Sequence, residues 1–132
     1  MKLAYTLDQF SALESAAGYF DLHNCYDVVH AHCTGDRSYV RFEKIAGEWV
    51  KPEAPAHLTL VFEQVSFFQV SEGLQFPIGL DFIAFKELAD QDLTCFMAQP
   101  GNDPVHLLLG LDNDAFIRIG ATSAFCLPSS LA

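Results

Sequence analysis

The stretch from Val28 to Glu43, VVHAHCTGDRSYVRFE, has the sequence pattern of a β-hairpin. Two runs with alternating apolar residues flank Gly35-Asp36, which has the composition of a two-residue loop with glycine at its first central position. Such a loop sets the register of the two strands. It predicts that Cys33 faces Ser38 and that the pairing continues outward, one residue at a time, to Val28 opposite Glu43.

This register divides the side chains of the hairpin between two faces, because neighbouring residues of a strand point in opposite directions. The predicted core face holds Val29, Ala31, Cys33, Val40 and Phe42. The opposite, polar face holds His30, His32, Tyr39, Arg41 and Glu43. The polar set is the candidate binding surface of the protein.

A metal site is the first alternative for this region, since FDLHNCYDVVHAHC (residues 20–33) contains three histidines and two cysteines. The register argues against it. His30 and His32 share a face, but Cys33 points the other way. Arg41 would stand between His30 and Glu43, and a fixed cation opposes a metal dication. We therefore expect no metal ion and no cofactor here.

A catalytic pair is the second alternative, because a cysteine beside a histidine can act as nucleophile and base. His23 and Cys25 share the parity of the core face if the strand extends that far back. No nucleophile motif surrounds Cys25. The interpretation is a buried thiol, and no catalytic residue is predicted.

An N-terminal helix is predicted over Thr6–Ala17. Thr6 can cap it, and Gln9 completes a capping box. Apolar residues recur with helical spacing, and Gly18 suits a left-handed stop. The apolar stripe consists of Phe10, Leu13 and Ala17.

After Gly18 the apolar period changes to two, which is typical of strands. The runs are VVHAHC, SYVRFEKI, HLTLVFEQ, VSFFQV, LDFIAF, LTCFMAQ, VHLLLGL and AFIRIGAT. The apolar parity changes near Gln64, which indicates that the third and fourth runs form one long strand with a bulge. The predicted fold class is mainly β (α+β): one domain, residues 1–132, in which an N-terminal helix precedes an antiparallel meander of about eight strands. The meander would form a sandwich or a partly open barrel.

The C-terminal runs predict a second apolar face. Pairing LTCFMAQ with VHLLLGL, and the latter with AFIRIGAT, sets Phe96 opposite Leu108 and Leu108 opposite Arg118. These three residues and Phe116 then share a face that is too apolar to remain in water. They are the candidate interface residues. The expected cover is the N-terminal helix, the connection AGEWVKPEAPAH (residues 46–57) or a second subunit of a homodimer.

Composition limits the partners. The chain of 132 residues has 17 acids against 7 bases and a net charge of −10. Phosphate backbones and anionic membrane surfaces repel such a protein, whereas a basic protein is attracted to it. The start MKLAYTLDQF lacks the apolar region of a signal peptide, so a cytoplasmic location and four reduced cysteines are expected.

The pattern from LTLVFEQVSFFQV through HLLLGLDNDAFIRIGA resembles small uncharacterised bacterial families built on an antiparallel sheet. Some of these families are grouped with immunity proteins that neutralise toxins. The resemblance implies a non-enzymatic binding role in a bacterial cytosol, and it supplies no functional residues.

Two functions are therefore expected from different classes. The first is a non-catalytic cytoplasmic binding protein that self-associates or binds a basic protein, in the manner of an immunity protein. The alternative is a small-ligand-binding protein or enzyme whose site lies inside a curled sheet and is lined by some of the twelve phenylalanines.

Overall fold

The computed structural model describes residues 1–91, 95–101 and 103–130, and nearly all of its regular structure is β. The elements in chain order are β1 (Lys2–Leu3), β2 (Tyr5–Asp8), β3 (Ala12–Ser15), β4 (Gly18–Asp21), α1 (Leu22–Cys25), β5 (Tyr26–Thr34), β6 (Arg37–Lys44), β7 (His57–Val70), β8 (Ile78–Glu87), β9 (Val105–Leu111), the 3-10 turn η1 (Asp112–Asp114) and β10 (Phe116–Ser129).

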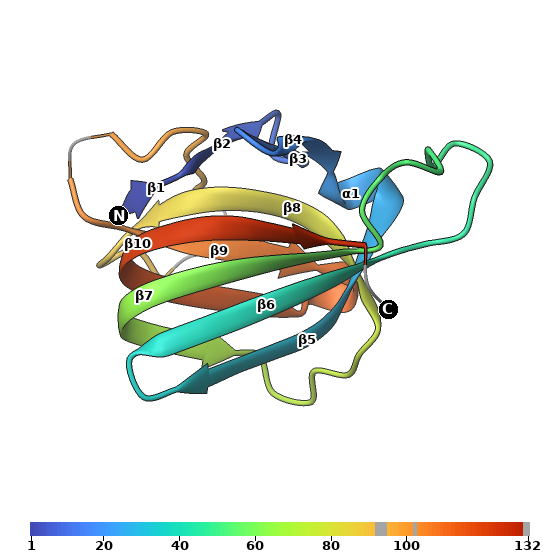
Figure 1. The fold of residues 1–132 in the computed structure, drawn as a ribbon. Coiled ribbons are helices and arrows are strands. Elements are labelled where there is room, and N and C mark those ends of the chain that lie inside the picture. Colours follow the sequence, from blue (N-terminus) through green and yellow to red (C-terminus); the bar gives the residue numbers. More distant parts are fainter. Residues whose placement is uncertain (92–94, 102, 131–132) are drawn as a thin grey trace.

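Six antiparallel strands form a closed barrel in the order β5-β6-β7-β10-β9-β8, and β8 returns to β5 (Figure 1). The closing contact is short, because β5 and β8 pair only at Asp27–Gly79 and Val28–Ile78. The short strand β1 adds to β10 in parallel. The expected sandwich or partly open barrel is therefore wrong, because it left out the long-range pairing of β8 with β5.

The long strand β7 confirms the bulge expected near Gln64. Gln64 has a left-handed backbone (φ 53°), and the register with β10 shifts between Gly120 and Ala121. From His57 to Glu63, β7 pairs with both β6 and β10. From Val65 to Val70, its only partner strand among the described residues is β10. The bulge lets one strand bend around the barrel and serve both of its halves.

The barrel interior is filled by side chains. The inward residues of all six strands join one apolar cluster, in which Phe42, Phe62 and Phe85 are fully buried. Branched and aromatic residues at every second position supply this cluster, as closure of a small barrel requires.

The N-terminal segment forms strands, so the predicted helix over Thr6–Ala17 is wrong. Tyr5 and Leu7 alternate with exposed residues and are buried in the core cluster. Gln9 and Phe10 take left-handed backbones in the turn, where the Ser11 amide donates to the Asp8 carbonyl over 3.0 Å. The three-stranded sheet β2-β3-β4 lies across the barrel (Figure 1). Burial of its alternating face against the core outweighs the local helix signals.

The segment before β5 differs from the strand that sequence parity extended backward. Leu22–Cys25 is a single helical turn, whose cap Asp21 accepts a hydrogen bond from the Asn24 amide. His23 is exposed, and Cys25 is partly buried. His23 and Cys25 lie in a helical turn, so, contrary to the expectation, they do not share the core face of a strand.

The β5–β6 hairpin confirms the predicted register next to the loop and contradicts it at the base. The pairs from Cys33–Ser38 to His30–Arg41 are as predicted. A bulge between Val28 and His30 then makes Val28, not Val29, the partner of Phe42. Val28 is fully buried, and Val29 is displaced toward the surface.

The predicted strand LTCFMAQ is not formed in its described part. Residues 93 and 94 lie outside the described residues, and Met97 makes only an isolated bridge with Phe85. The strand β9 pairs with β8 and β10 instead, so Phe96 is not opposite Leu108. The predicted pair Leu108–Arg118 is confirmed.

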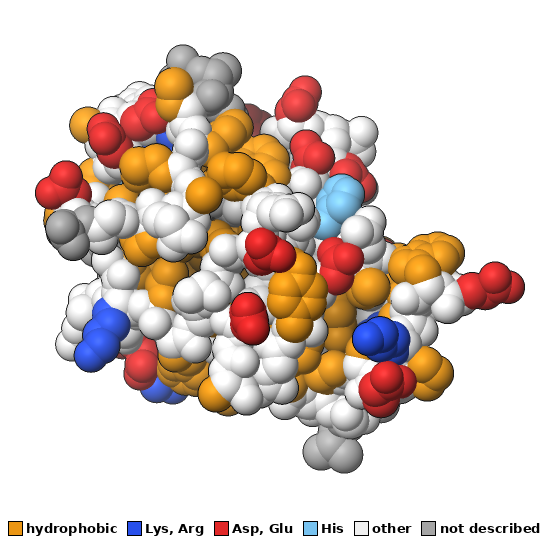
Figure 2. Space-filling view, turned by 90° about the horizontal axis from the view of Figure 1, so that it is seen from above, with side chains coloured by type: hydrophobic (Ala, Val, Ile, Leu, Met, Phe, Trp, Pro, Cys, Tyr) orange, Lys and Arg blue, Asp and Glu red, His pale blue; other side chains and the backbone are white. Residues whose placement is uncertain are grey.

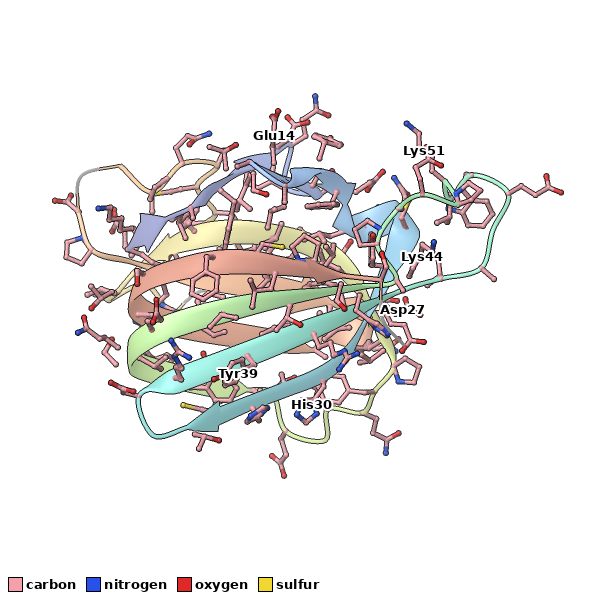
Figure 3. The ribbon with its side chains drawn as sticks, viewed as in Figure 1. Glu14, Asp27, His30, Tyr39, Lys44 and Lys51 are labelled. Carbon is pink, nitrogen blue, oxygen red and sulfur yellow. The ribbon has the colours of Figure 1, made fainter. Side chains whose placement is uncertain are left out.

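The connection between β6 and β7 projects from the barrel, and Lys51 lies on it (Figure 3). Lys44 closes its base by donating to the carbonyls of Pro52 and Ala54. The Trp49 indole donates to the Asn24 carbonyl, yet 63% of this residue is exposed. Within the described part of the chain, no helix has the length and apolarity needed to cross a membrane.

Candidate functional site

The five predicted binding residues lie on the outer face of the β5–β6 hairpin. The His30 and His32 rings are in contact, with Nε2 of the first 2.8 Å from Nδ1 of the second. The ring of His32 also stacks on Tyr39, with centroids 5.0 Å apart. His30 and Tyr39 are labelled on the two strands in Figure 3.

The two charged members of the set stand further along the same face. Arg41 is exposed and pairs in register with His30. Glu43 lies opposite Asp27 and helps to line a surface pocket of about 480 Å³ at the base of the hairpin. Partial burial, and next the nearby Asp112 carboxylate, raise the pKa of Asp27 above its ordinary value. The structure thus brings all five residues onto one surface, as two neighbouring groups.

The edge of β5 next to this face is open. From His30 to Thr34 the strand pairs only with β6, because the contact with β8 ends at Val28; this holds among the residues that the structure describes. An unpaired edge presents a row of main-chain donors and acceptors to another strand.

The predicted interface residues belong to the opposite half of the barrel, and the chain itself covers most of them. Leu108 is fully buried. Phe96, in the segment after β8, packs on Phe82 with ring centroids 4.4 Å apart. The predicted helix and the connection 46–57 are therefore not the cover. Phe116 and Arg118 lie at the margin of this covered area, where a pocket opens.

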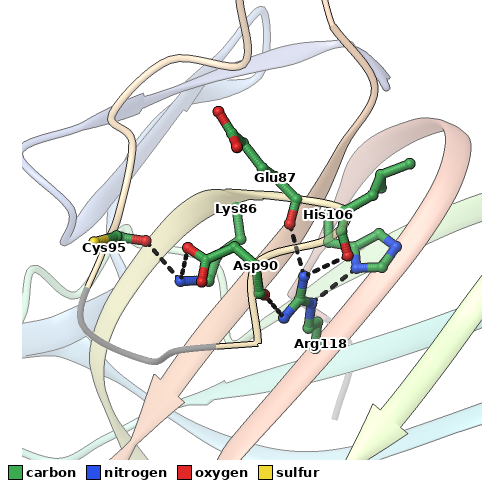
Figure 4. Close-up of polar contacts among 7 residues, drawn as sticks. Lys86, Glu87, Asp90, Cys95, His106 and Arg118 are labelled. Atoms are coloured by element: carbon green, nitrogen blue, oxygen red, sulfur yellow. Dashed lines mark hydrogen bonds and ion pairs between the residues drawn. The ribbon is translucent and has the colours of Figure 1, made fainter.

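Two buried cations, Lys86 and Arg118, hold the chain segment that follows β8 against the barrel (Figure 4). The Lys86 ammonium, fully buried on β8, contacts the Asp90 carboxylate at 2.7 Å and donates to the Cys95 carbonyl. It also lies 5.2 Å from the centre of the Phe96 ring. A carboxylate, a carbonyl and an aromatic face thus surround this charge.

Arg118 on β10 is also buried, with 6% of the residue exposed, but its partners are all neutral. Its guanidinium donates to three main-chain carbonyls, of which those of Asp90 and Glu87 are 2.6 and 2.9 Å away. Its Nε donates to Nδ1 of His106 over 2.8 Å (Figure 4). Within the described part of the chain, no carboxylate forms an ion pair with Arg118.

His106 is held in one tautomer by this contact. Because Nδ1 accepts from Arg118, the neutral ring carries its proton on Nε2. Burial, and then the Arg118 charge, lower the pKa of His106 below its ordinary value. Its ring also stacks on Phe67, with centroids 4.6 Å apart. His106 is therefore a neutral group that positions Arg118.

A pocket of about 540 Å³ opens beside this pair on the outside of the barrel. Phe67, Phe116 and Leu88 supply apolar walls, and Arg118 and His106 supply polar groups. Pockets of this size suit small molecules. Sequence reasoning named Phe116 and Arg118 as interface residues, but it did not include Phe67 or His106 among the site residues. The alternation of the run VHLLLGL places His106 on the same face as Leu108, which was the signal for it.

Cys25 in α1, Cys33 in β5 and Cys126 in β10 are free thiols on three separate elements. Burial raises the pKa of the Cys126 thiol to about 11 and that of Cys25 above its ordinary value. A raised pKa disfavours the reactive thiolate.

The fold and these two regions define a closed six-stranded β-barrel with an open edge on β5 and an external pocket beside Arg118. Protein-family models, curated proteins and solved structures were all compared with the chain, and none of them matches it.

Proposed function

We propose that this chain is a non-catalytic binding protein that adds an extended segment of a basic partner protein to the open edge of β5. The observation that carries the proposal is the one-sided pairing of His30–Thr34. Addition of a strand to an exposed edge is a common mode of peptide recognition, in which main-chain hydrogen bonds give affinity and neighbouring side chains give selectivity.

The composition of this edge suits pairing with a partner. Exposed edges are commonly protected by lysine, proline or inward-pointing charges. His30–Thr34 contains none of these. The stacked rings of His32 and Tyr39 lie beside the edge and offer a surface to side chains of the added strand.

Charge favours a basic partner over a second copy of this chain. Two molecules of net charge −10 repel each other, whereas a basic protein is attracted and steered. Asp27 and Asp36 stand before and after the open edge along the hairpin. They are placed to contact basic side chains at the two ends of an added strand.

The alternative of a ligand site inside the barrel has less support, because Phe42, Phe62 and Phe85 fill the interior. A cytoplasmic location is part of our proposal, and the free thiols of Cys25, Cys33 and Cys126 support it. An immunity-like role, in which the partner is a basic toxin, is one form of the same binding.

The test is calorimetric titration with a synthetic peptide of alternating lysine and valine. We expect saturable binding that weakens with salt. An acidic peptide with glutamate in place of lysine should not bind. A basic peptide methylated at alternate amides should also fail, because it cannot donate main-chain hydrogen bonds along one edge.

Charge variants at His32 place the contact on β5. His32→Lys should weaken binding of the basic peptide and His32→Glu should strengthen it, since residue 32 lies on the edge strand. Thr122→Lys and Thr122→Glu are the matched controls, because Thr122 is an exposed residue of β10, and β10 does not pair with β5. Equal effects at the two positions would contradict the site. If the protein alone forms a dimer, and His32→Lys dissociates it, a second copy of the chain occupies the β5 edge. That result would contradict the proposal of a basic partner protein.

A further inference from the structure

The outer pocket beside Arg118 has the features of a built anion site. Arg118 lies in its wall and is more than nine-tenths buried, yet its hydrogen bonds go to carbonyl groups and a neutral histidine. The other buried cation, Lys86, contacts the Asp90 carboxylate. The two neighbouring cations thus differ in one respect: only Lys86 has a protein anion as partner among the described residues.

Hydrogen-bond donors remain for a ligand. A guanidinium has five N–H groups, and the four hydrogen bonds of Arg118 use at most four of them. His106 lines the same pocket and carries its proton on Nε2, because Nδ1 accepts from Arg118. The residues that line the pocket therefore carry one fixed positive charge, one guanidinium N–H beyond the four hydrogen bonds of Arg118, and the Nε2–H of His106.

The remaining walls are uncharged. Phe67, Phe116 and Leu88 are apolar, and Gln69 and Gln91 are neutral amides. None of the described residues that line the pocket is acidic, although acids exceed bases by ten in the whole chain. The Arg118 guanidinium lies 5.9 Å from the centre of the Phe67 ring, so the charge and the aromatic wall are adjacent.

We propose that this pocket binds a small aromatic monocarboxylate, whose carboxylate meets Arg118 and His106 and whose ring lies against Phe67 and Phe116. A carboxylate matches the planar guanidinium and balances its single charge. A phosphate dianion would leave one negative charge unbalanced in an acidic protein. This site lies on the half of the barrel opposite the β5 edge and does not depend on the proposed partner protein.

Calorimetry with 1-naphthoate as the probe tests the proposal. We expect one molecule to bind per chain. The neutral 1-naphthamide has nearly the same shape and should bind at least about tenfold more weakly, because it lacks the charge. The dianion 1-naphthyl phosphate should also bind more weakly than 1-naphthoate.

A variant that leaves Arg118 in place locates the site, because removing Arg118 would detach the segment after β8 and obscure the result. Gln69 is exposed, lines the pocket and pairs with Arg118 across β7 and β10. Gln69→Glu keeps the shape and puts a competing carboxylate beside the guanidinium. We expect at least about tenfold weaker binding of 1-naphthoate.

Gln64→Glu is the matched control, since Gln64 lies on the same strand outside the residues that line the pocket. It makes the same charge change and should alter the affinity by less than about twofold. The proposal is overturned by equal affinities for naphthoate and naphthamide, by tighter binding of the phosphate, by equal effects of the two glutamates, or by no binding at millimolar naphthoate.

Discussion

Two buried cations show how neighbours decide the role of a single residue. Isolating a charge from water costs several kcal/mol unless other groups replace the water. Around Lys86 the replacement is the Asp90 carboxylate, and around Arg118 it is a set of carbonyls and His106. Both cations therefore hold the segment after β8 to the barrel, and Arg118 in addition keeps an excess of positive charge at the pocket.

His106 makes the stability of the protein depend on pH. Its pKa is lowered in the folded state, so the unfolded chain takes up the proton more readily. The stability that neutral His106 contributes is fully present above its unfolded pKa of about 6.5 and is lost as pH falls through the lower folded value. The loss can reach about 1.4 kcal/mol per pH unit for one proton.

The measurement is the free energy of unfolding in urea between pH 7.5 and 5, in the native protein and in His106→Gln. Glutamine can still accept from Arg118 but does not titrate. We expect the native protein to lose stability more steeply than the variant below pH 6.5. Parallel curves would show that His106 is not protonated when the protein unfolds.

At the scale of elements, bulges decide how strands close the barrel. The bulge in β5 moves Val29 out of the core register, next to the point where β5 meets β8. The bulge in β7 separates the part that pairs with β6 from the part that reaches β10 alone. Each bulge adds one residue to one strand, which increases the local bend and twist.

Gln64 tests the importance of the bulge in β7. Its φ of 53° is unfavourable for a branched side chain. Gln64→Val should therefore lower the free energy of unfolding by about 1–2 kcal/mol, whereas Gln64→Gly should change it by less than about 0.5 kcal/mol. Urea unfolding of the two variants checks this, and equal stabilities would show that the left-handed backbone is not maintained.

The whole molecule has many more acidic than basic side chains, 17 against 7. Seen from the side of the N-terminal sheet, Asp and Glu side chains are widespread and few basic ones appear (Figure 2). Asp8, Glu14 and Asp21 lie near Tyr19, and together raise its pKa, with the hydrogen bond from Tyr19 to Asp8 as the largest cause. On the β5–β7 face, Arg37 pairs with Glu63 at 2.7 Å.

Salt should stabilise a protein with this charge distribution. Screening weakens the repulsion among acids, and we expect about 1 kcal/mol more stability in high salt than in low salt. Glu14→Lys reduces the net charge and should gain less from salt. Urea unfolding at the two salt concentrations measures both. A loss of stability in salt would mean that pairs such as Arg37–Glu63 outweigh the repulsion.

What the sequence alone determined is local. Alternating apolar residues identified most strands, Gly35-Asp36 set the register of the neighbouring pairs, and the parity change at Gln64 located a bulge. These features depend on residues close together in the chain. The capping signals of Thr6 and Gln9 were local too, but burial of Tyr5 and Leu7 against the core outweighed them.

Only the tertiary structure decided the closure of the barrel and the two candidate sites. Closure depends on β8 meeting β5 about fifty residues away in sequence, which no local pattern specifies. The open edge of β5 exists because that contact ends at Val28. The pocket lies where the chain after β8 meets Arg118, whose guanidinium donates to the Asp90 carbonyl. The alternation of apolar and polar residues along each strand is visible in the sequence. The groups that pack against each strand face come from residues that are distant in the chain.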